Sequence, residues 1–238
     1  MYGPLGYTFW ILTELLQLAV VVCALRARCF VRFFPLNFYM LAASVLTAAR
    51  YLVFMEYGVN SSNYKYFYYY SDALLTICLF FALMGLFAHV FREMGAELYV
   101  RIGSVVVLGG TAVVSYIIVQ HSYTLAHHSQ HGFAAHFVAE LSQNLYFVGA
   151  VLTYLLWAAV KKLHETRTQL IQFVLALGVY FSALAASYAL AVLNPNIPIW
   201  KIGEYFAGIW LPLAWGYTFL KVPQAAKLST ARVATGSQ

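Results

Sequence analysis

Charged residues are scarce in this chain of 238 residues, where Asp, Glu, Lys and Arg make up 9% and hydrophobic residues make up 63%. A soluble domain carries about 25% charged residues. This chain therefore has too little polar surface to face water on every side, and its mean hydropathy of +0.74 agrees. The scarcity of charge excludes an ordinary soluble domain and predicts a protein surrounded by lipid.

The signatures of several enzyme and pigment classes are also missing. His164 and Glu165 are followed by Thr-Arg-Thr, so no H-E-x-x-H zinc motif exists. Glycine-rich phosphate loops and a G-x-S-x-G elbow are absent too. A retinal pigment of the microbial type needs a lysine midway along the last helix, but Lys201 and Lys221 lie at the two ends of that stretch. His89 stands alone inside an apolar stretch, which argues against a bis-histidine haem.

Long apolar stretches are what the chain does contain. A spanning helix needs about 20 residues, and seven stretches reach or approach that length. They predict an all-α integral membrane domain over residues 1–220, built as an up-and-down bundle of seven transmembrane helices. We expect residues 221–238 to form a short, basic, disordered tail. The predicted spans are Leu5–Leu25, Phe34–Met55, Tyr66–Phe91, Ile102–Val119, Phe133–Val160, Leu170–Leu193 and Trp200–Leu220.

The positive charges lie almost entirely on one side of these stretches. The loops after the first, third and fifth stretches, together with the tail, hold 11 of the 14 Lys and Arg residues. Short loops rich in Lys and Arg stay in the cytoplasm. The pattern predicts an external amino terminus and a cytoplasmic carboxyl terminus in a plasma membrane, which we take to be a bacterial inner membrane. Because orientation accounts for the net charge of +6, we expect lipid and no nucleic acid as a partner.

Ionisable residues inside the spans are candidates for function, because a charge in the bilayer is costly and usually faces the bundle interior. Five such residues come from five different stretches. At 1.5 Å rise per residue, each lies about 6–13 Å from the outer end of its stretch. They are Glu14, Arg50, Asp72, Glu140 and Glu204.

Arg50 and Asp72 lie at nearly equal depth on consecutive antiparallel helices, so we expect an ion pair between them. Taken alone, this pair is more often a structural contact between two helices than a functional one. Removing one partner of a buried pair costs about 3–5 kcal/mol in soluble cores.

The remaining acids point to a cavity. Four carboxyl groups face one internal base, so some of them should be protonated or should hold a cation. The first stretch supports an inward polar face, since Tyr7, Trp10, Glu14 and Gln17 follow a helical spacing of 3, 4 and 3. We therefore predict a polar cavity, open to the outside, that includes these residues with Glu140 and Glu204.

Five of the seven histidines lie between His121 and His136. His136 and Glu140 are four residues apart and share one helix face, and His128 and His131 precede them. Imidazole with carboxylate is a ligand set for a transition metal such as zinc. The competing interpretation is an exposed loop whose histidines titrate near neutral pH.

Aromatic residues are unusually dense in the run from Tyr64 to Tyr70. A belt of Tyr and Trp at the membrane interface is the ordinary explanation. A run of this length nevertheless covers every face of a helix, so some of its rings should point inward and could form the wall of a ligand pocket.

The short loops, the aromatic outer ends and the Tyr-Tyr-Tyr-Ser-Asp-Ala-Leu run at Tyr68–Leu74 resemble small bacterial seven-helix proteins. The layout is similar to that of the membrane sensor regions of some histidine kinases. This resemblance implies a receptor-like protein. Because the tail is too short for a folded output domain, a separate cytoplasmic partner would have to carry a signal.

The leading hypothesis is a non-enzymatic receptor-like or complex-forming subunit that binds a small ligand or a cation in the outer cavity. Three alternatives remain open. The first is a metal-dependent membrane enzyme that uses the outer His and Glu residues, with the intramembrane zinc hydrolases as a minor variant. The second is a structural protein that assembles into homo-oligomers, and the third is an ion or proton transporter.

Overall fold

The computed structural model describes residues 4–26, 30–31, 33–58, 60–92, 95–126, 132–162, 168–193 and 200–221, without the side chains of 4–7, 123–126 and 200–201. All regular secondary structure within these ranges is helical. The seven helices are α1 (Pro4–Arg26), α2 (Phe34–Tyr57), α3 (Ser62–Phe91), α4 (Glu97–Ala126), α5 (Phe133–Lys162), α6 (Thr168–Leu193) and α7 (Trp200–Lys221). The all-helical fold predicted from the sequence is confirmed. The predicted tail at 222–238 lies outside the described residues.

Local sequence signals set the helix ends more closely than hydropathy does. Gly58 ends α2 with a φ of 74°, and its N–H donates to the carbonyl O of Phe54 at 2.9 Å. Ser61 then caps α3, because its hydroxyl O accepts from the backbone N of Tyr64 at 3.1 Å. As a result α3 begins four residues before the predicted span. α4 likewise continues past both ends of its predicted span, since polar residues extend a helix that apolar residues started.

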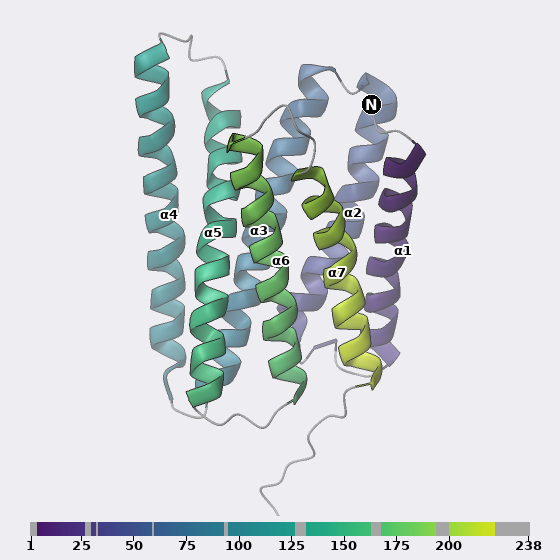
Figure 1. Ribbon diagram of the computed structural model, residues 1–238, viewed down its shortest axis with the longest axis vertical. Helices are drawn as coiled ribbons and strands as arrows, with labels where there is room; N and C mark the ends of the chain where they lie inside the picture. The colour runs from purple at the N-terminus through teal and green to yellow at the C-terminus, as the bar shows by residue number, and fades with distance from the viewer. Residues whose placement is uncertain are drawn as a thin grey trace, which may run out of the picture.

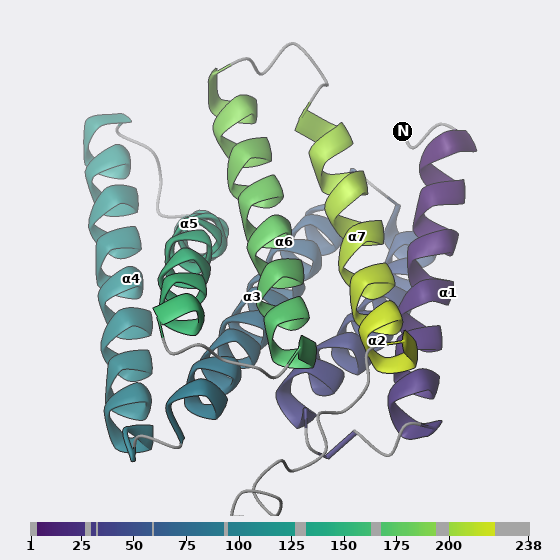
Figure 2. The same ribbon diagram turned by 60° about the horizontal axis from the view of Figure 1, so that its bottom comes forward.

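Six of the helices enclose a common interior, and α4 lies outside it (Figure 1). The order around this interior is α1, α2, α3, α5, α6 and α7, and the contact between α7 and α1 closes the ring. α4 lies at the periphery of the bundle, where its main neighbours are α3 and α5, as Figure 2 also shows. Residues near the start of α1 therefore meet residues near the end of α2 and the starts of α3 and α7.

Six helices, α1 to α6, are long and apolar enough to cross a membrane. α7 is not among them, because Trp, Tyr and Gly residues and the charge of Glu204 dilute its apolar side chains. It still packs along α1 and α6 as a full member of the bundle. The composition of the helices thus supports a multi-pass membrane protein.

The exterior and interior of the bundle differ as expected for a protein in lipid. Large apolar side chains such as Val105 and Leu155 are exposed, whereas small polar ones such as Thr76 and Ser187 are buried. Many buried hydroxyl groups donate to a carbonyl O in the preceding turn of their own helix, as Ser187 does to Ala183 at 2.7 Å. These bonds satisfy polar groups that lipid could not hydrate.

The half of the bundle that contains the end of α1 is filled by aromatic side chains. Phe173 lies at the centre, with ring centroids 4.8 Å from Phe33 and 5.2 Å from Phe219. Trp215 packs edge-on to Phe173 and is fully buried. These rings fill the centre of that half, and the cavity with aromatic walls lies in the opposite half, near the start of α1.

Candidate functional site

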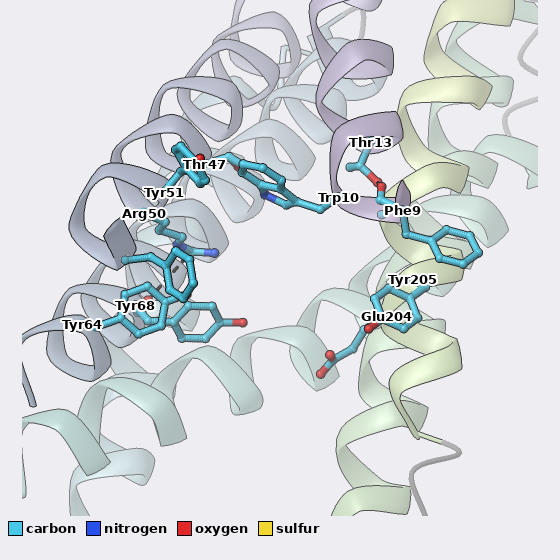
Figure 3. Close-up of a pocket in the computed structure, with 12 residues that line it drawn as sticks. Phe9, Trp10, Thr13, Thr47, Arg50, Tyr51, Tyr64, Tyr68, Glu204 and Tyr205 are labelled. Atoms are coloured by element: carbon cyan, nitrogen blue, oxygen red, sulfur yellow. Dashed lines mark hydrogen bonds between the residues drawn. The ribbon is translucent and has the colours of Figure 1, made fainter. Parts of the chain in front are cut away.

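A cavity of about 250 Å³ opens between α1, α2, α3 and α7, near the start of α1 (Figure 3). At about 30 Å³ for each water in the liquid, it has room for roughly eight waters or a small organic molecule. Twelve side chains or backbone segments line it. Seven are aromatic, Phe9, Trp10, Tyr51, Phe54, Tyr64, Tyr68 and Tyr205, and the others are Thr13, Thr47, Arg50, Glu204 and Gly208.

Aromatic contacts between neighbouring helices build the walls. Trp10 of α1 stacks on Tyr51 of α2 with ring centroids 5.4 Å apart, and Phe9 of α1 stacks on Tyr205 of α7 at 5.2 Å. The ring of Phe54 in α2 meets that of Tyr64 in α3 edge-on at 6.0 Å. Each pair joins two helices, so the rings that face the cavity also fix its shape.

Arg50 of α2 is held firmly at the boundary between the cavity and α3. Its Nε donates to the hydroxyl of Ser71 at 2.6 Å, and its Nη2 lies 3.4 Å from the carbonyl O of Tyr68. The guanidinium carbon lies 4.4 Å from the centroid of the Tyr68 ring, which adds a cation–π contact. A guanidinium with this many partners has a fixed position, which suits it to orienting a ligand.

Asp72 lies beside Arg50, with 3.8 Å between Asp72 Oδ1 and Arg50 Nη2. The structure thus brings together the two residues for which the sequence predicts an ion pair. Both side chains are largely buried, at 17% exposure for Arg50 and 22% for Asp72. Asp72 does not line the cavity itself but neutralises the guanidinium from behind.

Four tyrosines form a layer around Asp72, of which Tyr39 and Tyr146 are buried and Tyr180 and Tyr188 are partly buried. The hydroxyl groups of Tyr39 and Tyr180 lie 3.2 Å apart, and the Tyr146 hydroxyl lies 2.9 Å from Thr76 Oγ1. Tyr188 stacks on Tyr146 with centroids 5.6 Å apart. The charge of Asp72 acts electrostatically on all four tyrosines of this layer. The layer connects α2, α3, α5 and α6 beneath the cavity.

Glu204 of α7 lies across the cavity from Arg50, and Figure 3 shows its carboxyl group on the opposite wall from the guanidinium. α7 positions it in its second turn, and Gly208 one turn later faces Thr13 of α1. A Cβ on Gly208 would contact Thr13 Oγ1 at 3.6 Å, so a longer side chain there would occupy space between α7 and α1, where both residues line the cavity.

Other predicted cavity residues lie elsewhere. Trp10 lines the cavity, but Glu14 and Gln17, one and two turns further along α1, turn toward α2, where the Ser44 hydroxyl lies 3.5 Å from Gln17 Oε1. Glu14 interacts with the same hydroxyl. The side chain of Tyr7 lies outside the described residues. Among the residues of this predicted polar face whose side chains are described, Trp10 lines the cavity and Glu14 and Gln17 do not.

Glu140 also lies apart from this cavity, at the contact of α5 with α4. Its Oε1 accepts from Asn144 Nδ2 at 3.2 Å, and the same amide donates to Ser115 of α4 at 2.9 Å. Because α4 is peripheral, Glu140 faces an outer helix and not the ring interior. The hydrogen bonds of Glu140 and Asn144 belong to a polar contact between α5 and α4.

His136 is exposed, one turn before Glu140 on α5. His128 and His131, the other predicted metal ligands, lie outside the described residues. Across the part of the chain that is described, no three His, Cys, Asp or Glu side chains come together as ligands for a metal ion. The predicted metal site thus stays a prediction that depends on the segment 127–131.

Several cavity residues escaped the sequence reasoning, and spacing could have found them. Tyr51 and Phe54 follow Arg50 by one and four residues, so they belong to the same broad helix face. In the aromatic run, Tyr64 and Tyr68 are four apart and face the cavity, while Tyr66, Tyr69 and Tyr70 are exposed. The run thus contributes both to an outer belt and to a wall of the cavity.

Comparison of this chain with protein-family models, curated proteins and solved structures gives no significant match. The resemblance to kinase sensor regions therefore stays a prediction, and function has to be argued from the cavity.

Proposed function

We propose that this protein is a non-enzymatic, receptor-like membrane subunit that binds a small organic molecule in the cavity between α1, α2, α3 and α7. All seven helices span the membrane in this proposal, and the cavity opens to the outside. The packing of α7 between α1 and α6 supports a seventh span. The membrane is a bacterial inner membrane, and a separate cytoplasmic partner receives the signal.

The distribution of charge supports this orientation. Basic side chains gather at the end of the bundle away from the cavity, near the end of α1 and the end of α7. Following the rule that cytoplasmic loops are basic, that end lies inside and the cavity end lies outside. The described members of this group are Arg26, Arg92, Arg101, Lys161, Lys162 and Lys221.

One observation carries the binding function. The first three helices and the last one enclose a cavity with aromatic walls and two opposed charged groups. Ligand sites are typically concave, mostly apolar and equipped with a few fixed polar groups. Arg50 and Glu204 are such groups here. A charged side chain within the membrane is costly and is therefore a candidate for function. The aromatic side chains that fill the half of the bundle beneath the cavity favour a binding site over a continuous pore.

The test is a screen for thermal stabilisation of the purified protein in lipid nanodiscs, using small amines, carboxylates, zwitterions and neutral compounds. A ligand present at 100 times its Kd stabilises the folded state by about 2.7 kcal/mol. Gly208→Leu should abolish this effect, because its side chain enters the cavity. Gly109→Leu is the matched control, since a Cβ on Gly109 has no heavy atom within 4 Å.

The proposal requires at least one compound that stabilises the wild type and Gly109→Leu but not Gly208→Leu. If no chemical class stabilises the protein, or if Gly208→Leu responds like the wild type, the cavity is not a binding site.

A further inference from the structure

A second hollow lies on the outer surface of the bundle, between α5 and α6. These helices are side by side in Figures 1 and 2, and α4 lies on the other side of α5. The groove between α5 and α6 has a volume of about 450 Å³ and shares no lining residue with the cavity described above. Its rim is exposed at Tyr154, Leu175 and Val179. In a bundle surrounded by lipid, such a groove is open to acyl chains.

A glycine and two small hydroxyl side chains keep the space between the helices open. Gly178 of α6 faces Thr153 of α5, and a Cβ on Gly178 would meet Thr153 at 3.8 Å with no closer heavy atom. Ser182 follows one turn later, and its hydroxyl lies 3.4 Å from that of Tyr154. The other lining residues are apolar or aromatic, namely Trp157, Val174, Leu175, Val179 and Ala183. The lining therefore suits a hydrocarbon chain.

The groove covers the depth of one leaflet. At 1.5 Å rise per residue, Val174 and Ser182 lie about 9 and about 21 Å beyond the start of α6. The hydrocarbon core of a bilayer is about 30 Å thick, so one leaflet accounts for about 15 Å. The groove thus begins near the end of the bundle that holds the start of α6 and reaches the middle of the bilayer, as an acyl chain does.

A lysine lies beside the groove at that end. The Nζ of Lys161 is 5.3 Å from the centroid of the Trp157 ring, and Trp157 lines the groove. Lys161 and its neighbour Lys162 are both exposed in the last turn of α5. The cation–π contact holds an ammonium group where the headgroup of a lipid in the groove would lie.

This end of the bundle stays positive whatever contacts the residues outside the described ranges make. From Lys161 to Arg167 the sequence contains three basic residues and one acidic residue, Glu165. The loops and tail that hold 11 basic residues contain two further acidic residues, Glu93 and Glu97. Basic sites between transmembrane helices on the cytoplasmic side typically bind anionic lipid headgroups.

We propose that the groove between α5 and α6 binds a phospholipid with an anionic headgroup. Its acyl chain lies along Gly178, and its headgroup lies beside Lys161 and Lys162. This lipid site is separate from the cavity between α1, α2, α3 and α7 and does not rest on the function proposed for that cavity.

Native mass spectrometry of the full chain tests the charge preference. The purified protein is titrated in detergent with phosphatidylglycerol and with phosphatidylcholine of the same acyl chains. We expect phosphatidylglycerol to bind at least about fivefold more tightly, because one Lys near an anionic surface contributes about that much. Lys161→Gln should weaken its binding about fivefold and leave that of phosphatidylcholine unchanged. Arg101→Gln, which removes a positive charge from the same end but on the peripheral α4, should change neither.

Filling the groove tests the location. Gly178→Leu places a side chain between α5 and α6 and should abolish binding of phosphatidylglycerol. Gly109→Leu is the matched control, since a Cβ there has no heavy atom within 4 Å, and it should bind like the wild type. Leu175→Trp narrows the groove from its exposed rim and gives the same test if Gly178→Leu does not fold.

Equal binding of the two lipids by the wild type overturns the inference, and this comparison needs no variant to fold. Undiminished binding of phosphatidylglycerol in the groove variants overturns it too. A wild-type dimer that Gly178→Leu dissociates would assign the groove to a second copy of the chain, which also contradicts the lipid site. None of these results affects the proposed function, which the Gly208→Leu screen decides separately.

Discussion

The ion pair of Arg50 and Asp72 gives the sharpest quantitative prediction. Two unit charges 3.8 Å apart attract by about 4 kcal/mol at an effective dielectric constant of 20. Replacing Asp72 by Asn removes this attraction and leaves a buried guanidinium without its counter-charge. Arg50 keeps its contacts with Ser71 and Tyr68 and is 17% exposed. We therefore expect Asp72→Asn to lower the free energy of unfolding by about 2–4 kcal/mol, near the lower end of the range for broken buried pairs.

A double-mutant cycle isolates the pair from its surroundings. Its corners are the wild type, Asp72→Asn, Arg50→Met and the double variant, and the free energy of unfolding is measured for each in the same detergent. Because the two residues are in contact, the double variant should be more stable than the sum of the single effects by about 1–3 kcal/mol. A coupling below about 0.5 kcal/mol would show that the two side chains act independently and would refute the reasoning.

Three further predictions concern packing, hydrogen bonding and orientation. Gly149→Ala should destabilise the bundle by about 1–3 kcal/mol in thermal or chemical unfolding, because a Cβ there overlaps the ring of the buried Phe181. The control Gly109→Ala, on an open face, should be neutral or slightly stabilising. Equal effects of the two substitutions would argue against the close contact of Gly149 with Phe181. Tyr146→Phe should cost about 1–2 kcal/mol by the same measurement, since it removes the hydroxyl that lies 2.9 Å from Thr76 Oγ1; no loss would mean that this bond contributes nothing to stability. A fluorescent protein that folds only in the cytoplasm should be fluorescent when it is fused to the carboxyl terminus. A fusion protein of normal abundance without fluorescence would contradict the proposed orientation.

The sequence predicts the helices well because one physical property sets them. Apolar stretches of about 20 residues must form helices in lipid, where every backbone polar group needs an internal partner. The starts of α2, α5 and α7 accordingly coincide with the predicted spans. The predicted span Ile102–Val119 is shorter than α4 at both ends. Hydropathy indicates which residues lie in lipid, but it does not indicate where helical hydrogen bonding ends.

The site is harder to predict because depth in the membrane does not specify direction. The sequence predicts comparable depths for Glu140 and Glu204, yet Glu204 lines the cavity, while Glu140 bonds to Asn144 at the contact of α5 with α4. The difference arises from the order of helices around the bundle, in which α4 is peripheral and α7 closes the ring on α1. Arg50 and Asp72 could be paired from sequence because consecutive antiparallel helices with a short connection are neighbours by necessity.

Glu14 supports a final prediction, because it is the least satisfied charged residue in the described part of the bundle. Its Oε2 is buried and accepts no hydrogen bond from any described residue. Leaving such an oxygen without a partner costs about 1–3 kcal/mol. Glu14→Met keeps the length of the side chain and removes both oxygens, so we expect the variant to unfold with a free energy about 1–3 kcal/mol higher than the wild type.

The opposite result for Glu14→Met would be equally informative. A loss of stability would mean that the carboxyl group has a favourable partner in the membrane, such as a bound cation, and that the unsatisfied oxygen marks its position. Glu14→Gln separates the two explanations, since an amide keeps the shape and the contact with Ser44 but not the charge. If Gln stabilises as Met does, burial of the carboxyl group is a pure cost to the fold, and a sequence that retains it does so for a reason other than stability.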